Sequence, residues 1–121
     1  MRPEVLLSAL VLCIGCGTKS LPEPQNSQSR SAIRAATETN ANNYPSASLY
    51  LKMATDEIKR AEALIEDDEE EGALRALQRA EIDAELALDL ARAEQAREDA
   101  RQALARVQEL RREGMDEGME E

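Results

Sequence analysis

The sequence predicts an all-α fold: an antiparallel coiled-coil helical hairpin with a short helix before it, two to three helices in total. Helical periodicity runs from about residue 29 to about residue 112, with breaks at 42–45 and in the acidic run before Gly72. Two segments, 47–65 and 73–91, repeat apolar residues at alternating spacings of four and three, which is typical of helices that pair along a seam. One short turn joins the two segments, so the two helices are expected to run antiparallel.

Residues 1–15 have the organisation of a bacterial export signal. A positive end with Arg2 precedes an apolar run from Val5 to Leu12, and small residues then precede a cysteine. The apolar run is too short to span a membrane, which takes roughly 20 residues of helix. We therefore expect a signal peptide over 1–15 that is removed.

The segment Cys13-Ile14-Gly15-Cys16 resembles the lipid-attachment box of bacterial lipoproteins at Gly15 and Cys16, although Leu is usual where Cys13 stands. The resemblance implies that Cys16 becomes the acylated first residue, and two or three acyl chains hold a protein stably on a membrane. Gly17 follows, where Asp would favour the inner membrane in enterobacterial-type sorting, so the resemblance implies the outer membrane, facing the periplasm. Two alternatives are a plain secretory signal with an incidental thiol at Cys16, and a redox or metal pair with Cys13.

Residues 16–28 are expected to be the acylated cysteine and a flexible tether, because residues 17–28 lack periodicity and hold two prolines. A tether of about 12 residues reaches roughly 20 Å. The helical domain then covers 29–112, with helices at about 29–42, 46–66 and 70–112. We expect 113–121, which holds two glycines among acidic residues, to be a disordered tail.

Folding the chain about position 69 places the two apolar stripes of the hairpin opposite each other. Four of the six resulting pairs set a large residue against an alanine, which fills space evenly while the helix axes approach closely. The pairs are Ile65 with Ala73, Ala61 with Leu77, Ile58 with Ala80, Ala54 with Ala84, Leu51 with Ala87, and Ala47 with Ala91.

The helix expected at 70–112 would be over 60 Å long, and its apolar face changes partway. Beyond Ala91 a second stripe runs about 150 degrees around the helix from the first. Because this stripe extends past the base of the hairpin, something else must cover it. Either the short helix at 29–42, whose one sizeable apolar residue is Ile33, folds back over it, or it pairs with another copy or another protein. The candidate partner-binding residues on this stripe are Ala93, Ala96, Ala100, Ala103, Val107 and Leu110.

Acidic residues gather in two places. The turn at 66–72 holds six of them and Gly72, but it lacks the alternating ligand spacing and central glycine of a calcium-binding EF-hand loop. We interpret it as a solvated turn, with weak metal binding as the alternative, and assign no metal ligands. Asp83, Glu85 and Asp89 are interpreted as the solvated stripe between two apolar faces, because metal sites in helical bundles draw ligands from facing helices.

Composition argues against several functions. The chain has no His, and its one mature Cys is expected to be acylated, so we assign no catalytic residues, no cofactor and no enzymatic activity. A net charge of −10 argues against nucleic acid and against anionic head groups. The absence of Phe and Trp argues against a large apolar pocket for a small-molecule substrate. Attachment to a membrane would then depend on the acyl chains of Cys16.

Over about residues 31–105 the chain resembles the bacterial envelope lipoproteins catalogued as domain of unknown function 4398. It departs from the family pattern in lacking an alanine between the tyrosine and the proline, in having Asn42 and Asn43 where small residues are usual, and in a longer acidic tip. The resemblance implies a fold and a location and offers no catalytic residues. The matching positions are Tyr44, Pro45, Gly72, Ala73, Leu74, Leu77, Ala80 and Asp83-Ala84-Glu85-Leu86-Ala87.

These features lead us to expect a lipid-anchored helical spacer or protein-interaction module of the bacterial cell envelope, with its acidic tip presented into the periplasm. Its partner would be an envelope protein or a second copy. One alternative is an adaptor subunit of a specific envelope complex that binds through the 93–110 seam. The other is weak metal binding at the 66–71 tip.

Overall fold

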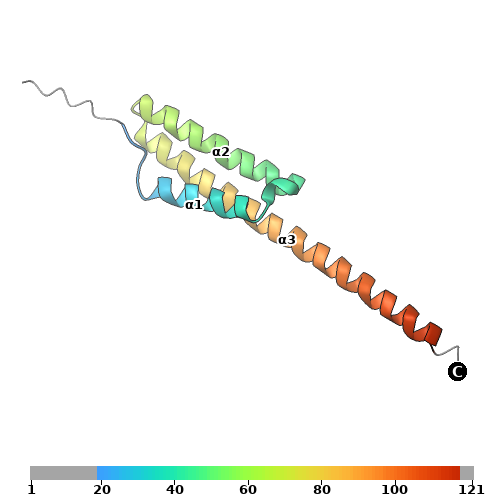
Figure 1. Ribbon diagram of the computed structural model, residues 1–121. Coiled ribbons are helices and arrows are strands. Elements are labelled where there is room, and N and C mark those ends of the chain that lie inside the picture. Colours follow the sequence, from blue (N-terminus) through green and yellow to red (C-terminus); the bar gives the residue numbers. More distant parts are fainter. Residues whose placement is uncertain (1–18, 118–121) are drawn as a thin grey trace, which may run out of the picture.

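The computed structural model describes residues 19–117. Within that range the chain forms α1 (Gln25–Glu38), the short 3₁₀-helix η1 (Ala41–Asn43), α2 (Pro45–Glu66) and α3 (Glu70–Glu117). Helices α2 and α3 form the hairpin, and α1 lies along the first half of α3 and runs parallel to it (Figure 1). The expected all-α fold, a helical hairpin with a short preceding helix, is confirmed. The predicted signal peptide and Cys16 lie outside the described residues.

Helix α1 begins at Gln25, four residues before the expected start of the 29–42 helix. The carboxylate of Glu23 accepts hydrogen bonds from the side chain of Asn26 at 3.0 Å and from the backbone N–H of Ser27 at 3.3 Å. The bond from Ser27 satisfies a backbone donor that a first helical turn otherwise leaves unpaired. The end of the expected tether is therefore helical.

Helix α1 ends at Glu38 rather than at residue 42, because Asn40 adopts a left-handed backbone with φ 59°. Asn tolerates that conformation better than most residues. Tyr44 is then extended, as residues before proline usually are, and Pro45 takes the first position of α2, where a helix does not need the missing N–H. The break between the helices thus occupies residues 39–44.

The turn between α2 and α3 is built on Asp68, whose φ is 61°. The N–H of Asp68 donates to the Ile65 carbonyl at 3.2 Å, and the N–H of Glu69 donates to the Leu64 carbonyl at 2.8 Å, the bonding pattern of a Schellman motif. Gly72, expected in this turn, lies instead in the first turn of α3. A Cβ there would lie 3.4 Å from both methyl carbons of Leu64, an ordinary contact distance, so Gly72 faces α2 with room for a methyl group.

Alanine fills most of the core. Every residue of the two predicted hairpin stripes is buried except Ile65, which is half-buried. Ala36, Ala41 and Ala76, which the stripes did not include, are also buried. The core residues are Ala36, Ala41, Ala47, Leu51, Ala54, Ile58, Ala61, Ala73, Ala76, Leu77, Ala80, Ala84, Ala87 and Ala91.

The core divides into two clusters that agree with the expected pairing. At the base, Ala47 and Leu51 share a cluster with Ala87 and Ala91. Near the tip, a second cluster brings the residues around Ile58 together with those around Leu77, and Ile33 of α1 packs against both clusters. Ile33, the one large apolar residue of α1, therefore packs α1 onto the hairpin. Helix α1 does not cover the part of α3 that extends past the base of the hairpin.

The segment before α1 lies against the hairpin tip. Lys19 Nζ donates to the Glu66 carbonyl at 3.0 Å and lies 2.8 Å from Asp68 Oδ1. Leu21 packs against the cluster near the tip. The expectation of a flexible tether up to residue 28 is therefore wrong for 19–28: residues 19–24 are held at the tip, and 25–28 form the first turn of α1.

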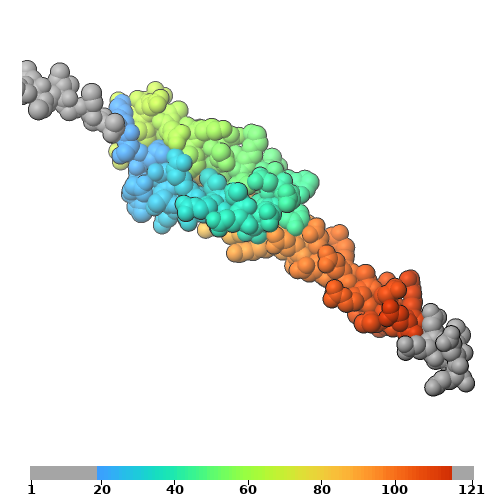
Figure 2. Space-filling model, viewed as in Figure 1, coloured from blue at the N-terminus to red at the C-terminus, as the bar shows by residue number. Residues whose placement is uncertain are grey.

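Helix α3 continues past its expected end at residue 112 to Glu117, through Gly114. Its 48 residues span about 72 Å. Figure 2 shows its last part, in orange and red, projecting beyond the other helices as a single rod. We call residues 96–117 the arm. The expectation that the short helix folds back over the 93–110 stripe is wrong, because α1 packs beside the earlier half of α3.

Candidate functional site

Two side-chain contacts mark the place where the arm leaves the bundle. Gln95 Nε2 donates to the Thr39 carbonyl at 2.8 Å, and Tyr44 Oη donates to Glu98 Oε2 at 3.2 Å. Burial, and then the negative charge of Glu98, raise the pKa of Tyr44 above its ordinary value. Both contacts fasten the 39–44 loop to α3, so the bundle ends at about residue 98.

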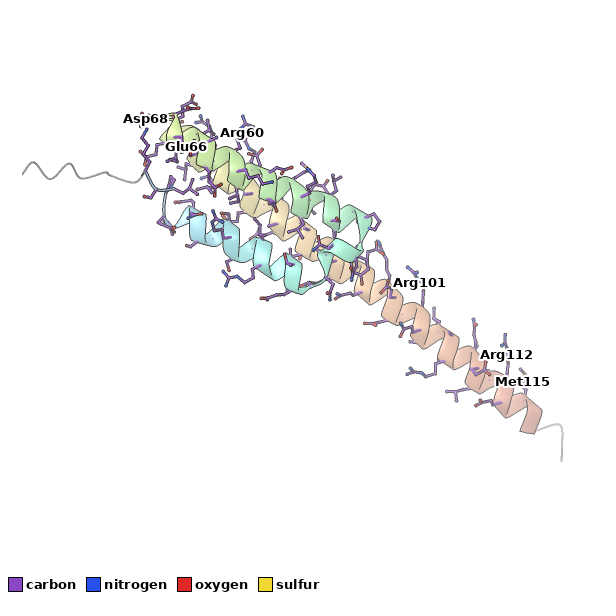
Figure 3. The ribbon with its side chains drawn as sticks, turned by 45° about the horizontal axis from the view of Figure 1, so that its top comes forward. Arg60, Glu66, Asp68, Arg101, Arg112 and Met115 are labelled. Carbon is purple, nitrogen blue, oxygen red and sulfur yellow. The ribbon has the colours of Figure 1, made fainter. Side chains whose placement is uncertain are left out.

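We use the name seam for the six candidate partner-binding residues. All six are exposed, and no residue from 96 to 115 is even half-buried. The exposed fraction is 44% for Val107 and 61% for Leu110. Figure 3 shows Arg101, Arg112 and Met115 along the arm, far from Glu66 and Asp68 at the opposite end of the molecule. The structure therefore leaves the seam on a single helix with no other helix of residues 19–117 against it.

The exposed apolar surface is longer than the predicted seam. Ile82 and Leu86 lie at positions of the same repeat toward the tip, beyond the exposed Asp89 that occupies the position between them and Ala93, and are also exposed, with Ile82 at 62%. On the arm, Leu104 and Met115 add large apolar side chains beside the seam. Near Ile82 and Leu86 the sequence makes α3 apolar on both sides, so it does not by itself determine which side α1 covers.

The arm differs in charge from the rest of the molecule. Residues 96–117 hold five arginines and six acidic residues, a net charge of −1, whereas the whole chain has a net charge of −10. The excess negative charge therefore lies outside this segment. A nearly neutral, mixed-charge helix with an apolar stripe is suited to pairing with another helix.

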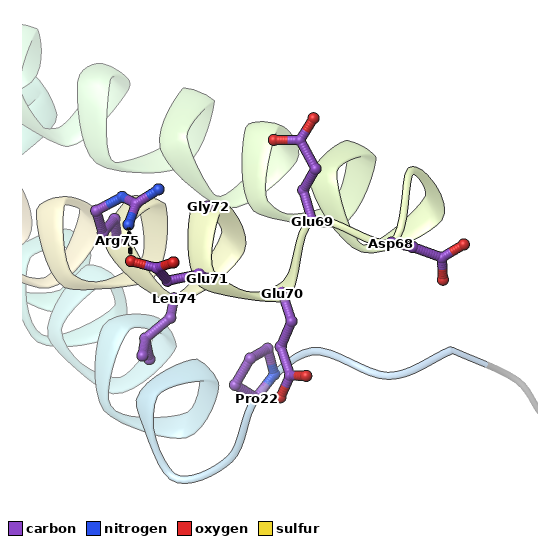
Figure 4. Close-up of a pocket in the computed structure, with 8 residues that line it drawn as sticks. All are labelled: Pro22, Asp68, Glu69, Glu70, Glu71, Gly72, Leu74 and Arg75. Atoms are coloured by element: carbon purple, nitrogen blue, oxygen red, sulfur yellow. Dashed lines mark hydrogen bonds and ion pairs between the residues drawn. The ribbon is translucent and has the colours of Figure 1, made fainter.

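The acidic tip does not assemble a metal site. Figure 4 shows the carboxylates of Asp68, Glu69, Glu70 and Glu71 pointing in different directions around a shallow depression of about 580 Å³. Glu71 pairs with Arg75, and Asp68 pairs with Lys19. Within residues 19–117, no three carboxylates lie close enough together to hold a metal ion.

Asp83, Glu85 and Asp89 do not converge either. Glu85 is exposed, and Asp89 is exposed with Arg92 3.8 Å away. Asp83 is half-buried near Glu57 of α2; burial, and then the charge of Glu57, raise its pKa, while Arg79 opposes the shift. Glu85 and Asp89 lie four residues apart on one exposed face of α3, whereas Asp83 lies on another face, half-buried at the edge of the hairpin interface.

Glu57 is held by arginines from two helices. Its Oε2 atom is buried and lies 3.5 Å from Arg79 Nε, an ion-pair contact that is not a hydrogen bond, and its Oε1 atom lies 3.7 Å from Arg60. These contacts place Glu57 on the same edge of the α2–α3 interface as Asp83. The edge is a feature of helix pairing and not of ligand binding.

Together these features define a helical-hairpin protein whose last helix projects an exposed apolar stripe. A model of the family described as a domain of unknown function (DUF4398) matches residues 24–103, which is more than half of the chain. The chain belongs to this family. No curated protein and no solved structure matches it. None of the helices formed by residues 19–117 is long and apolar enough to cross a membrane.

Proposed function

We propose that the protein is a lipid-anchored, non-catalytic helical module of the bacterial cell envelope that presents its arm for protein contact. The proposal places it on a membrane through acyl chains on Cys16, and on the outer membrane facing the periplasm. What supports the anchor is the Gly15-Cys16 pair after a short apolar run. Several acyl chains would hold the protein stably.

One observation carries the proposal: the chain's N-terminal segment and the seam lie at opposite ends of the rod. Lys19, three residues after Cys16, is bound at the hairpin tip, whereas the seam lies on the arm at the other end. The tip would therefore be the anchored end. We expected the acidic tip to be presented into the periplasm; the proposal places the tip at the anchored end, because Lys19 lies against Glu66 and Asp68.

The length of α3 sets the reach of the module. From Glu70 to Val107 the helix extends about 55 Å at 1.5 Å per residue. An acyl group attached beside the tip would thus hold one end of the rod and leave the seam about that distance away. The arrangement suits a spacer that positions a contact surface at a fixed distance from its anchor.

The anchor is tested by metabolic labelling with a palmitate analogue and by membrane fractionation, comparing the native chain with Cys16→Ser. We expect label and membrane association in the native chain and neither in the variant. Equal labelling of the two, or a native chain in the soluble fraction, would contradict the anchor.

The contact role is tested in cells by photo-cross-linking from position 100, with position 105 as the matched control. Both positions are exposed alanines on the arm, but Ala105 lies outside the seam. We expect a reproducible protein adduct from position 100 and none from position 105. Adducts from both positions in equal amounts, or from neither, would argue against a specific surface at the seam.

A further inference from the structure

We propose that the seam binds a second copy of this chain, with the two arms antiparallel and centred between positions 101 and 102. The inference rests on the proposed function only in that a shared anchor brings copies together. The pairing itself is argued from the exposure of the seam and from the charges that flank it.

In this arrangement the position numbers of facing seam residues add up to 203. Large residues then meet alanines, as in the hairpin of the same molecule, where Leu51 and Ala87 lie in one cluster. Alternation of large and small residues lets two helices approach closely. The facing pairs across the two copies are Ala93 with Leu110, Ala96 with Val107, and Ala100 with Ala103.

The residues on one edge of the seam have complementary charges in this register. Arg92, Asp99, Arg106 and Glu113 each come directly before a position of the 3–4 repeat. In antiparallel coiled coils such residues face each other across the interface. Asp99 then faces Arg106 of the second copy, and Arg92 faces Glu113 of the second copy. Because the pairing is symmetric, each contact occurs twice, which gives four attractive pairs.

The opposite edge of the seam carries Arg97, Leu104 and Arg111, which each follow a seam residue directly. In the proposed register Arg97 faces Leu104 of the second copy. The aliphatic part of an arginine can cover a leucine while its charged end stays in water. This edge therefore brings no like charges together.

Neighbouring registers are disfavoured by the same residues. A shift of one heptad in one direction places Asp99 opposite Asp99 of the second copy, and Arg92 opposite Arg106 of the second copy. A shift of one heptad in the other direction places Arg106 opposite Arg106 of the second copy, and Asp99 opposite Glu113 of the second copy. Both shifts also bring arginines of the second edge together. Like charges in facing positions repel, so of these three registers only the proposed one is free of such contacts.

A parallel pairing is disfavoured as well. In a parallel coiled coil, the residue directly before Ala93, Ala100 or Val107 faces the partner residue whose number is five higher than its own. Arg92 would then face Arg97, and Arg106 would face Arg111. Each repulsive contact would occur twice, so the charges select the antiparallel orientation.

The hairpin itself shows that flanking residues with this offset are close in space. Facing residues of the two hairpin stripes have position numbers that add up to 138, and the flanking residues Glu57 and Asp83 add up to 140. In the proposed arm pairing the seam residues add up to 203 and their flanking residues, such as Asp99 and Arg106, to 205, the same excess of two. The charge of Glu57 acts on the pKa of Asp83. Tyr50 and Leu90, which also add up to 140, pack against one cluster. The facing rule used for the arms thus agrees with the packing and electrostatics of the hairpin.

Pairing places the two hairpin tips about 95 Å apart, at opposite ends of the dimer. Since Lys19 of each copy is bound at a tip, two copies anchored in one membrane would lie along its surface. An interface rich in alanine buries little apolar area and is expected to be weak in dilute solution. Confinement on a membrane raises the effective concentration of the two arms.

Disulfide cross-linking in cells tests the register. Two copies with tags of different size are co-expressed, one with Ala96→Cys and the other with Val107→Cys, and are oxidised before electrophoresis. Once residues 1–15 are removed and Cys16 is acylated, the native chain has no thiol, so the unsubstituted chain is the blank. We expect a mixed product that carries both tags. Dimers linked between two Ala96→Cys copies instead would show a parallel pairing and overturn the proposal.

A matched pair with Ala105→Cys in place of Ala96→Cys controls for random collision, because both alanines are exposed. We expect little mixed product from it. Equal yield from the two pairs would overturn a specific interface, and so would adducts that contain only other proteins.

Charge reversal then separates a second copy from a foreign partner. Arg106→Glu turns two attractive contacts into repulsive ones and is expected to lower the cross-linked fraction by roughly tenfold. Adding Asp99→Arg on the same chain exchanges the two charges and should restore the cross-link. A foreign partner would not be rescued by this exchange, so a failure of rescue would overturn self-pairing.

The same cells report on the anchor independently. A cross-link that is absent while the protein stays in the membrane fraction would overturn the pairing and leave the anchor standing. A cross-link that persists in a soluble protein would overturn the anchor and leave the pairing standing. Asp99 and Arg106 are exposed and lie beyond the core, so circular dichroism of the variants should show unchanged helix content.

Discussion

The hydroxyl of Tyr44 donates a hydrogen bond to Glu98 Oε2 over 3.2 Å, and this contact ties the start of α2 to the place where α3 leaves the bundle. Gln95 reinforces it through the Thr39 carbonyl. The loop at 39–44 is thus the last part of the bundle to touch α3. These contacts decide how much of α3 is packed and how much is arm.

The phenol of Tyr44 is expected to lose its proton at higher pH than an ordinary tyrosine. Burial and the Glu98 carboxylate both favour the neutral phenol, so the pKa is raised above 10.0 in the folded protein. The resulting contribution to stability is fully present below the unfolded pKa and is lost as the pH rises through the folded pKa.

Ultraviolet absorbance of the phenolate measures this titration in a Tyr50→Phe background, where Tyr44 is the one remaining tyrosine. Glu98→Gln should move the titration midpoint back toward the ordinary value, because it removes a negative charge and keeps an acceptor for the hydroxyl. An unchanged midpoint would show that Glu98 does not act on Tyr44.

Asp83→Asn is expected to stabilise the hairpin near neutral pH. Burial and the charge of Glu57 raise the pKa of Asp83 above 3.8, so the folded state binds this proton more tightly than the unfolded state. The contribution of Asp83 to stability is therefore favourable below its unfolded pKa and is lost as the pH rises through its folded pKa. Replacing the carboxylate should raise the free energy of unfolding by about 0.5 kcal/mol at about pH 7.

Urea unfolding of Asp83→Asn at about pH 7 and at about pH 3 measures this difference. At the lower pH the Asp83 carboxyl, whose pKa is raised, is mostly protonated, so the substitution should have little effect. Asp89→Asn is the control, because Asp89 is exposed and its ion pair with Arg92 is 3.8 Å long. A gain of the same size at both pH values would contradict a charge effect at Asp83.

Gly72→Ala is expected to raise the stability of the hairpin by about 0.5–1 kcal/mol, because alanine loses less backbone freedom on forming a helix. The added Cβ would meet Leu64 methyl carbons at 3.4 Å, an ordinary contact distance. Gly114→Ala is the comparison, since a Cβ at that position has no neighbour within 4 Å. It should raise helix content in the arm without moving the unfolding midpoint of the bundle. A destabilised Gly72→Ala protein would mean that α2 and α3 need the glycine for close approach.

The hairpin could be predicted from the sequence because its signal is local and repeated. The stripes through Leu51, Ile58 and Leu77 each extend over five turns, and the clusters agree with the pairing about position 69. The position of α1 could not be predicted in the same way. Its one large apolar residue, Ile33, fits either side of a helix that is apolar on two faces, and only the packed structure shows which side it covers.

The N-terminal contacts and the end of the arm escaped prediction for a different reason. Lys19 and Leu21 belong to no periodic pattern, yet they bind at the tip through an ion pair and a partly buried side chain. Gly114 suggested a helix end, but α3 passes through it. A single contact or a single weak helix former produces no repeated pattern in a sequence from which it could be predicted. Its effect on where the candidate site lies is nevertheless large.

The final prediction separates the core of the bundle from the arm with two leucines on the same helix. Leu77→Ala removes a side chain with an exposed fraction of 0%, so it should lower the free energy of unfolding by about 2–4 kcal/mol. Leu104→Ala removes one with an exposed fraction of 63% and should change it by less than about 0.5 kcal/mol. Urea unfolding of the two purified variants in dilute solution measures both values. A large loss of stability in Leu104→Ala at low concentration would show that the arm is packed within a single chain, and it would remove the reason for assigning the arm to contact with another one.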